Sequence, residues 1–283
     1  MLQFATGASL AILISLIAWR LHMLSTSGMI TAAIMGTLVF GLGGLPWACL
    51  LIGFFISSSL LSRLARRRKL QYEEKYSKGS SRDAWQVIAN GGVATMLLVF
   101  TYIQREIIGC SDTCFSANGW AFLTFAGSLA AANADTWATE LGVLSRTEPR
   151  LITSGRKVQP GTSGGVSLTG IMAASAGGLL IAGLAALPWS GIPHPLVWYQ
   201  VVLWLTGAGL VGSLVDSILG ATLQIIYYCP SCKKETEKSP QHSCGSNTIK
   251  LRGIDGIDND VVNLACTLSG AVLIWLVFML RLH

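Results

Sequence analysis

The sequence predicts an all-α polytopic transmembrane helical bundle with about eight spans. Hydrophobic residues make up 52% of the 283 residues and charged residues only 12%, and the mean hydropathy is +0.56, which lies outside the range of ordinary soluble domains. Apolar runs long enough to cross a hydrocarbon core of about 30 Å recur along the chain. Because backbone polar groups must be satisfied within lipid, and no alternating strand pattern is present, these runs predict helices.

The predicted spans form a single membrane domain over residues 1–283. They run roughly over 2–18, 28–43, 45–62, 86–103, 119–141, 166–188, 196–224 and 260–280, with lengths suited to membrane helices. The first run has Arg20 after it and no basic residue before it, so it is interpreted as a span and not as a secretory signal. The sequence GLGGLP over 41–46 predicts a tight helical hairpin between the second and third spans.

The distribution of cations predicts the orientation. All but two of the 20 Lys and Arg residues, Arg105 and Arg281, fall on one side of the eight-span arrangement. Cations near span ends are retained in the cytoplasm, so this side is predicted to be cytosolic and both termini extracytoplasmic. No transit peptide is evident, so a prokaryotic plasma membrane is expected.

Three predicted loops then face the cytosol: a basic loop over 63–84, a glycine-rich loop over 146–165 and a Cys-rich loop over 228–259. The formal net charge of +6 suits anionic lipid headgroups and anionic substrates. The basic run over 63–69 directly follows a span, so it is interpreted as a topological anchor, and no nucleic-acid partner is expected.

Three carboxylates lie inside predicted spans. Asp135 and Glu140 are near the cytosolic end of the fifth span, and Asp216 is near that of the seventh. An ionisable group in a span costs roughly 2.5–3.5 kcal/mol on insertion scales, so it normally faces a polar cavity or a partner. Helical spacing places Asn133, Thr136 and Glu140 on one face and Asp135 elsewhere. For Asn133 and Thr136, hydrogen bonds that merely join helices remain an alternative.

A glycine-rich segment over 154–167 leads into the sixth span from the cytosolic side. Its glycines, its hydroxyls and the start of the helix can direct several donors at one anion. The segment does not match the Walker pattern, and a flexible connection is the alternative. Because it shares a membrane face with the carboxylates, it is predicted to bind phosphate through Arg156, Lys157, Gly161, Thr162, Ser163, Gly164 and Gly165.

An acidic cluster over 255–263 precedes and begins the eighth span. Asp258 alone would be interpreted as a helix cap, but the density of carboxylate and amide oxygens suits Mg²⁺, which binds carboxylates together with substrate phosphates. Acidic groups facing an anion-binding loop predict metal-assisted phosphoryl or nucleotidyl transfer. The predicted Mg²⁺ ligands are Asp135, Glu140, Asp216, Asp258 and Asp260, and the first three are the catalytic candidates.

The Cys-rich loop contains a candidate metal knuckle formed by Cys229, Cys232, His242 and Cys244. The gap between the two pairs is shorter than in common zinc ribbons, so a structural Zn²⁺ site and a loop with incidental thiols both stay open. A zinc ion would stiffen the loop. Cys110 and Cys114 on the opposite face could form a disulfide if that face is oxidising.

Four segments together resemble the membrane-protein family that contains plant phytyl-phosphate kinase and eukaryotic transmembrane protein 19. They are NADTWATELG at 133–142, PGTSGGVS at 160–167, DSILGATLQ at 216–224 and NDVVN at 259–263. The resemblance implies a kinase that converts a phytyl or prenyl monophosphate to its diphosphate with Mg²⁺ and a nucleoside triphosphate, CTP or ATP. The implied substrate contacts within these segments include Asn133, Thr136, Ser217, Gln224, Asn259 and Asn263.

Three other functions remain as alternatives, and the first of them would use nearly the same residues. The first is a CTP-dependent nucleotidyltransferase that acts on a lipid phosphate. The second is an anion or ion transporter, which is disfavoured because the carboxylates lie toward one face and no inverted repeat is evident. The third is a lipid-binding scaffold without turnover.

Overall fold

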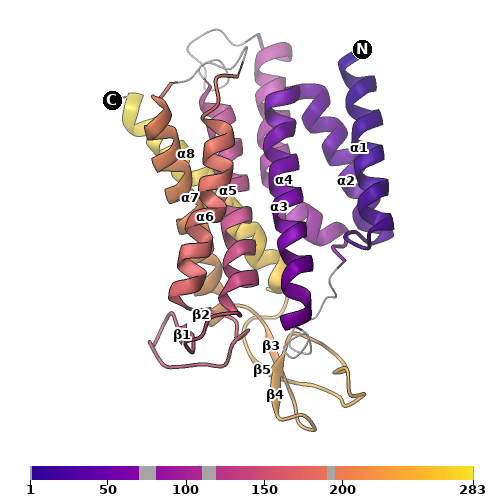
Figure 1. Cartoon of the computed structure of the whole chain (residues 1–283), viewed down its shortest axis with the longest axis vertical. Coiled ribbons are helices and arrows are strands. Elements are labelled where there is room, and N and C mark those ends of the chain that lie inside the picture. Colours follow the sequence, from indigo (N-terminus) through magenta and orange to yellow (C-terminus); the bar gives the residue numbers. More distant parts are fainter. Residues whose placement is uncertain (1, 70–80, 110–118, 190–194, 283) are drawn as a thin grey trace.

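The computed structural model describes residues 2–69, 81–109, 119–189 and 195–282, with only the backbone for 65–69 (Figure 1). Cys110, Cys114 and much of the basic loop lie outside the described residues. The helices are α1 (Leu2–Arg20), α2 (Thr26–Gly43), α3 (Leu45–Lys69), α4 (Ala84–Tyr102), the π-helical turn η2 (Ile103–Ile107), α5 (Trp120–Gly142), α6 (Leu168–Ala185), α7 (Trp198–Thr222) and α8 (Asn259–Leu282). The strands are β1 (Arg150–Leu151), β2 (Gly165–Val166), β3 (Ile226–Cys229), β4 (Lys234–Thr236) and β5 (Ile249–Arg252).

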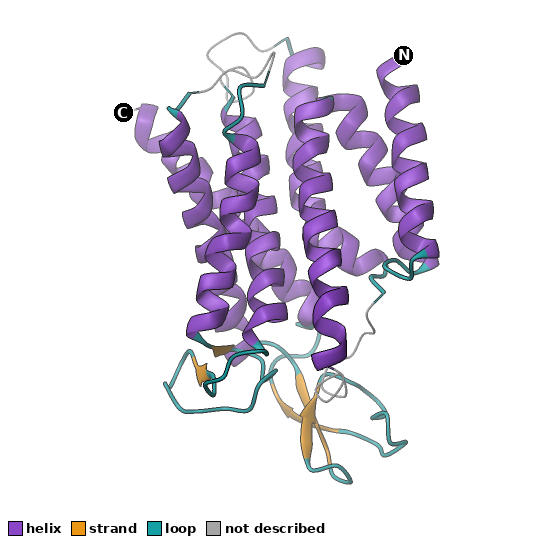
Figure 2. Ribbon diagram, in the orientation of Figure 1, coloured by secondary structure: helices purple, strands orange, loops and turns teal. Residues whose placement is uncertain are grey.

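The α-helices form a bundle along the long axis of the molecule (Figure 2). Both labelled termini lie at one end, and the strands lie at the other, which we call the strand-bearing end (Figure 1). Seven of the described helices are long and apolar enough to cross a membrane. The predicted all-α polytopic membrane fold is therefore confirmed, and most helix boundaries fall within a few residues of the predicted spans.

Helix α5 lies at the centre of the bundle and packs against α3, α4, α6, α7 and α8. Its first fifteen residues, Trp120 to Ala134, are all buried. Trp47 of α3 packs edge-on against Phe122 and Phe125, with ring centroids 5.2 and 4.9 Å apart. Protein surrounds this first part of α5, so its sequence is free to include polar residues. Among the described α-helices α5 is the one that does not qualify as an apolar span.

Short-range signals fix where several helices begin. Gly44, at φ +74°, separates α2 from α3 and confirms the predicted hairpin. Asp83 and Gln86 form a reciprocal capping box at the start of α4. Ser167 accepts the amide hydrogen of Gly170 and so caps α6.

Two small sheets occupy the strand-bearing end. Strands β1 and β2 pair antiparallel, with Leu151 opposite Gly165. Strand β3 lies between β4 and β5 and is antiparallel to both. Since β3 closely follows α7 and β5 closely precedes α8, this sheet is tied to two helices of the bundle.

Candidate functional site

Asp135 on α5 and Asp216 on α7 form an acidic pair where the two helices meet. The two carboxylates are close enough to interact electrostatically, and Ser213 Oγ donates to Asp135 Oδ1 at 3.4 Å. Asp216 Oδ2 is buried and accepts no hydrogen bond from a described residue. Two adjacent carboxylates with an unpartnered oxygen favour a bound cation, and oxygen ligands suit Mg²⁺. The acidic pair therefore fits a magnesium ion.

Small residues on both helices bring this pair together. A Cβ on Gly212 of α7 would lie 2.4 Å from Ala131 Cβ on α5, so the two backbones touch at that level. Asp135 and Asp216 each follow four residues later, and the two helices run in the same direction (Figure 1). Residues four apart share a helix face, so the close contact directs both carboxylates to the same interface.

Glu237, just after β4, adds a third carboxylate that the sequence analysis did not identify. Its charge interacts with Asp216, and its Oε1 accepts a hydrogen bond of 2.9 Å from Gln224 Nε2. Glu237 belongs to no apolar run and no recognised motif, so nothing in the local sequence distinguishes it. The β3–β4 turn brings it back to the end of α7.

Gln224 joins Glu237 to the glycine-rich loop. Its side chain is only 2% exposed, and its Oε1 accepts a hydrogen bond of 2.9 Å from Ser163 Oγ. Gly164, at φ +81°, packs so closely on α7 that a Cβ there would lie 2.4 Å from Ala221 Cβ. The structure therefore brings Gln224, Ser163 and Gly164 together at the end of α7, as the prediction of a shared site requires.

The cation that contacts the end of α7 beside Ser163 is not one of those expected. Arg252 of β5 donates to the carbonyl oxygens of Gly220 and Ala221 at 2.9 and 2.8 Å, which places positive charge at the negative end of α7. Arg156 and Lys157 are instead exposed, and Lys157 pairs with Glu148 at 3.1 Å on the surface. The sequence analysis missed Arg252 because its position in β5 gives no signal of contact with α7.

Two of the other predicted residues lie on a different face of α5. Asn133 donates to the Gly177 carbonyl at 2.8 Å and accepts from Ser57 Oγ at 2.9 Å. Glu140 Oε1 accepts from Ser62 Oγ at 2.9 Å. Glu140 lies about 140° around the helix from Asp135 at 100° per residue, so the structure joins Glu140 to α3 and not to the acidic pair.

The remaining predicted residues have local roles in the structure. Thr136 and Ser217 donate to the carbonyls of Ala132 and Ser213 in their own helices. Asp258 Oδ1 accepts the amide hydrogens of Asp260 and Val261 at 3.0 and 3.1 Å and so caps α8. The predicted substrate contacts Asn259 and Asn263, with Asp260, lie in the first two turns of α8.

The four knuckle residues converge into one cluster. Their ligand atoms, on Cys229, Cys232, His242 and Cys244, all lie within 4.8 Å of one another. The Sγ atoms of Cys229 and Cys244 are 3.6 Å apart, and Cys232 Sγ is 3.5 Å from His242 Nδ1. A tetrahedral zinc with bonds of about 2.0–2.3 Å needs ligand separations of roughly 3.5–3.8 Å. The cluster therefore fits zinc.

The thiols of this cluster also show why a cation suits it. Hydrogen bonding with Cys244 and, to a smaller extent, burial raise the pKa of Cys232 to about 11. Three thiolates in one cluster repel each other, whereas a metal ion stabilises all three.

Comparisons with known proteins agree with this architecture. The chain matches the family described as integral membrane protein DUF92 over residues 9–271. It is 35% identical to Protein PGR of Arabidopsis thaliana over 271 residues, which cover 91% of each chain. It is 32% identical to an uncharacterized membrane protein of Methanocaldococcus jannaschii over 201 residues, covering 71% of this chain and 75% of the other. No solved structure matches.

The match extends from the first helix to the last and includes all four segments that carry the resemblance. The predicted family membership is therefore confirmed, and the chain belongs to the integral membrane protein DUF92 family.

Proposed function

We propose that the protein is a membrane-embedded kinase that phosphorylates an isoprenoid monophosphate, phytyl or prenyl, to its diphosphate with Mg²⁺ and a nucleoside triphosphate, ATP or CTP. The observation that carries the proposal is the pair Asp135 and Asp216: Asp135 accepts a hydrogen bond from Ser213 of α7, and the charge of Asp216 interacts with those of Asp135 and Glu237. Gln224 links Glu237 to the glycine-rich loop. This combination is suited to phosphoryl transfer, in which alignment and charge neutralisation supply most of the catalysis.

The proposed reaction needs no strong general base. An oxygen of the lipid phosphate, already an anion, attacks the γ-phosphorus of the nucleotide. The bond from that phosphorus to the β–γ bridging oxygen breaks, and the nucleoside diphosphate leaves. Mg²⁺, when bound, would neutralise the charge on the phosphates. Asp135 and Asp216 would hold it, with Glu237 at the side of Asp216.

The glycine-rich loop is the proposed site for the nucleotide phosphates. Gln224 and Arg252 fix its position relative to α7, since Gln224 contacts Ser163 and Arg252 holds the neighbouring carbonyls of α7. Gly164 lets the loop approach the helix. These residues would position the nucleotide, and a glycine-rich backbone at the start of α6 is suited to binding its phosphates.

The proposed orientation places the strand-bearing end in the cytosol of a prokaryotic cell, where nucleotide is available. The cation distribution supports it. Fusing reporter domains to each terminus tests this orientation. Activity of a periplasm-specific reporter at both termini is expected, and activity of a cytoplasm-specific reporter there would contradict it.

The catalytic proposal is tested with purified protein, Mg²⁺ and phytyl or geranylgeranyl phosphate. Each nucleoside triphosphate is supplied with label on either the α- or the γ-phosphate. Transfer of the γ label to lipid is expected. Transfer of the α label would instead support a nucleotidyltransferase, and nucleotide-independent uptake of anions into proteoliposomes would support a transporter.

Matched variants connect any activity to the acidic pair. Asp216→Asn is expected to abolish transfer of the γ label. Asp255→Asn makes the same chemical change at a side chain that is 80% exposed and pairs with Lys250, so activity should persist. Equal activity in both variants would remove the acidic pair from the mechanism.

A further inference from the structure

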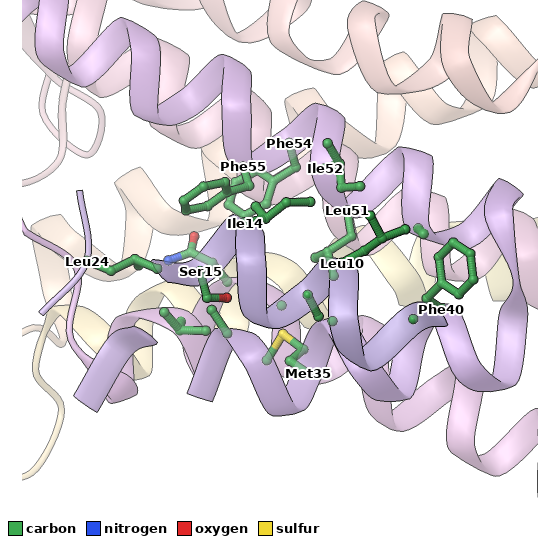
Figure 3. Close-up of a pocket in the computed structure, with 18 of the residues that line it drawn as sticks. Leu10, Ile14, Ser15, Leu24, Met35, Phe40, Leu51, Ile52, Phe54 and Phe55 are labelled. Atoms are coloured by element: carbon green, nitrogen blue, oxygen red, sulfur yellow. The ribbon is translucent and has the colours of Figure 1, made fainter. Parts of the chain in front are cut away.

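An apolar cavity of about 260 Å³ lies among α1, α2, α3 and α4. Figure 3 shows Leu10, Met35, Phe40 and Leu51 among the side chains that surround it. Its volume is close to the lower limit of roughly 300–1,000 Å³ for ligand pockets. Leu10 of α1 lines the cavity and is also 47% exposed, so the cavity borders the surface of the bundle. It is suited to a hydrocarbon chain.

Polar groups gather at one end of this cavity. Its polar lining side chains are Ser15, Arg82, Gln86 and Asn90. Ser15 lies near the end of α1, Gln86 and Asn90 lie near the start of α4, and Arg82 just precedes α4. These positions meet at the strand-bearing end, because the chain turns there between α1 and α2 and enters α4 from the same side (Figure 1).

Arg82 also lines a second cavity of about 100 Å³. The other polar side chains around this second cavity are His22, Ser59, Ser62 and Arg63. Two guanidinium groups and two hydroxyls around a small space are typical of a phosphate site. The shared side chain of Arg82 makes the apolar and polar cavities neighbours.

Ser59 provides an independent indication of a ligand. Its side chain lines the polar cavity and is only 5% exposed. Its Oγ is buried and has no hydrogen-bond partner among the described residues. Leaving a buried hydroxyl unpaired costs about 1–3 kcal/mol, whereas a phosphate oxygen in the cavity would accept this hydrogen bond.

The position of Arg82 is fixed by its neighbours. Its amide donates to the Met23 carbonyl at 2.9 Å, and its carbonyl accepts from the Ser25 amide at 3.0 Å. Its guanidinium lies 5.4 Å from the centre of the Phe54 ring. Desolvation lowers the pKa of Arg82 to about 10, although the charge of Glu140 opposes this shift. Arg82 therefore remains a cation at neutral pH.

We infer that the two cavities together bind one single-chain lipid monophosphate, with its chain in the apolar cavity and its phosphate against Ser59, Arg63 and Arg82. The single apolar cavity fits the first part of one chain, and the rest of a long chain would extend past Leu10 into the bilayer. The apolar cavity adjoins the polar cavity at Arg82, so a single chain that enters it carries its phosphate to that side chain. The inference rests on the proposed kinase function for the choice of a prenyl monophosphate as ligand, and the site lies on the α3 side of α5.

Contacts between α3 and α5 place this phosphate site at the depth of the acidic pair but on the α3 side of α5. Ser57 contacts Asn133 and Ser62 contacts Glu140, so the two helices, which run in the same direction, are in register. Ser59 lies between the two contacts on α3, as Asp135 does on α5. Ser62 links the polar cavity directly to α5, because its hydroxyl bonds Glu140.

The inference is tested by equilibrium binding of radiolabelled geranylgeranyl phosphate to the purified full chain, without nucleotide or Mg²⁺. Ala32→Phe fills the apolar cavity, and Arg63→Gln removes one cation from the polar cavity. Each is expected to weaken binding about tenfold or more. Ala5→Phe, at an exposed position of α1, and Arg146→Gln, at an exposed loop position, make the same changes elsewhere and should leave the Kd unchanged.

Competitors identify the ligand chemistry. Unlabelled prenyl phosphate should displace the label, whereas geranylgeraniol, inorganic phosphate and a diacyl phosphatidic acid should each compete at least about tenfold less well. Thermal unfolding confirms that each variant is folded, and Ser59→Ala serves as a milder second variant of the polar cavity. Equal affinity of all folded variants, or equal competition by phosphatidic acid, would overturn the inference.

The lipid-binding inference and the kinase proposal can fail independently of each other. Asp216→Asn should lose phosphoryl transfer and keep lipid binding. Specific binding without any transfer by the unmodified protein would refute the kinase and leave the lipid site standing. Phosphoryl transfer by the unmodified protein, together with an unchanged Kd for lipid in folded Ala32→Phe and Arg63→Gln, would refute the lipid site and leave the kinase standing.

Discussion

Gly212 of α7 and Ala131 of α5 are in backbone contact, so that a Cβ on Gly212 would lie 2.4 Å from Ala131 Cβ. Gly212→Ala must push the helices apart and is expected to destabilise the protein by about 1–3 kcal/mol. It should also lower the proposed kinase activity at least about tenfold by moving Asp216. Gly207→Ala is the matched control, because no heavy atom lies within 4 Å of the added carbon. Thermal unfolding and initial rates distinguish the two variants.

Asp216→Asn is expected to reduce kcat at least about 100-fold while leaving the fold intact. Removing one of two adjacent negative charges relieves repulsion, so the thermal midpoint without Mg²⁺ should stay equal or rise. Adding Mg²⁺ should raise the midpoint of the unmodified protein and not that of the variant. A variant that Mg²⁺ still stabilises to the same extent would show that the ion binds elsewhere.

Gly164 and Gly155 provide a test of the glycine-rich loop. Both have positive φ, but a Cβ on Gly164 would collide with Ala221, while nothing lies within 4 Å of one on Gly155. Gly155→Ala should show only the conformational cost of about 1 kcal/mol. Gly164→Ala should also displace the loop, raise the KM for nucleotide about tenfold and speed tryptic cleavage at Arg156. Equal KM values in both variants would count against a nucleotide site here.

Removal of the metal should destabilise the Cys-rich loop and leave the helices largely folded. Metal analysis is expected to find about one zinc per chain, lost in Cys232→Ser and retained in Cys49→Ser, whose thiol lies in α3. Loss of zinc should speed tryptic cleavage after Lys233 and Lys234 without a comparable fall in helical signal. Zinc retained at full content in Cys232→Ser would contradict the assigned ligands.

Arg82 and Glu140 should behave as an energetically linked pair. Their charges interact, so Arg82→Gln removes a favourable interaction with Glu140 and is expected to cost about 1–3 kcal/mol. The double variant with Glu140→Gln should recover part of that loss. A double-mutant cycle on the free energy of unfolding measures the link, and strictly additive effects would show that the two side chains are independent.

The span pattern was predictable because lipid contact imposes apolar character on whole helices. The hairpin at Gly44 was predictable for a local reason, since a glycine and a following proline interrupt an apolar run. The orientation of Asp135 away from Asn133 and Glu140 followed from helical spacing alone. The spans, the hairpin and the orientation of Asp135 all depend on residues that lie near one another in the sequence.

The partners of these residues were not predictable in the same way. Glu237 and Arg252 reach α7 only because the sheet around β3 folds back on the bundle. Ser59 is one of several serines in α3, and what distinguishes it is a cavity shared with residues that follow α1 and precede α4. The separation of Glu140 from the acidic pair depends on which helix lies on each side of α5.

The enclosure of α5 has a consequence for topology assignment throughout the family. A helix segment that is enclosed by protein does not need apolar side chains to be stable in the bilayer. Substitutions can therefore lower its hydropathy without expelling the helix from the membrane. A hydropathy scan then counts an odd number of crossings. Every loop after Gly142 would then be assigned to the wrong side of the membrane, and the glycine-rich and Cys-rich loops would be placed opposite the basic loop.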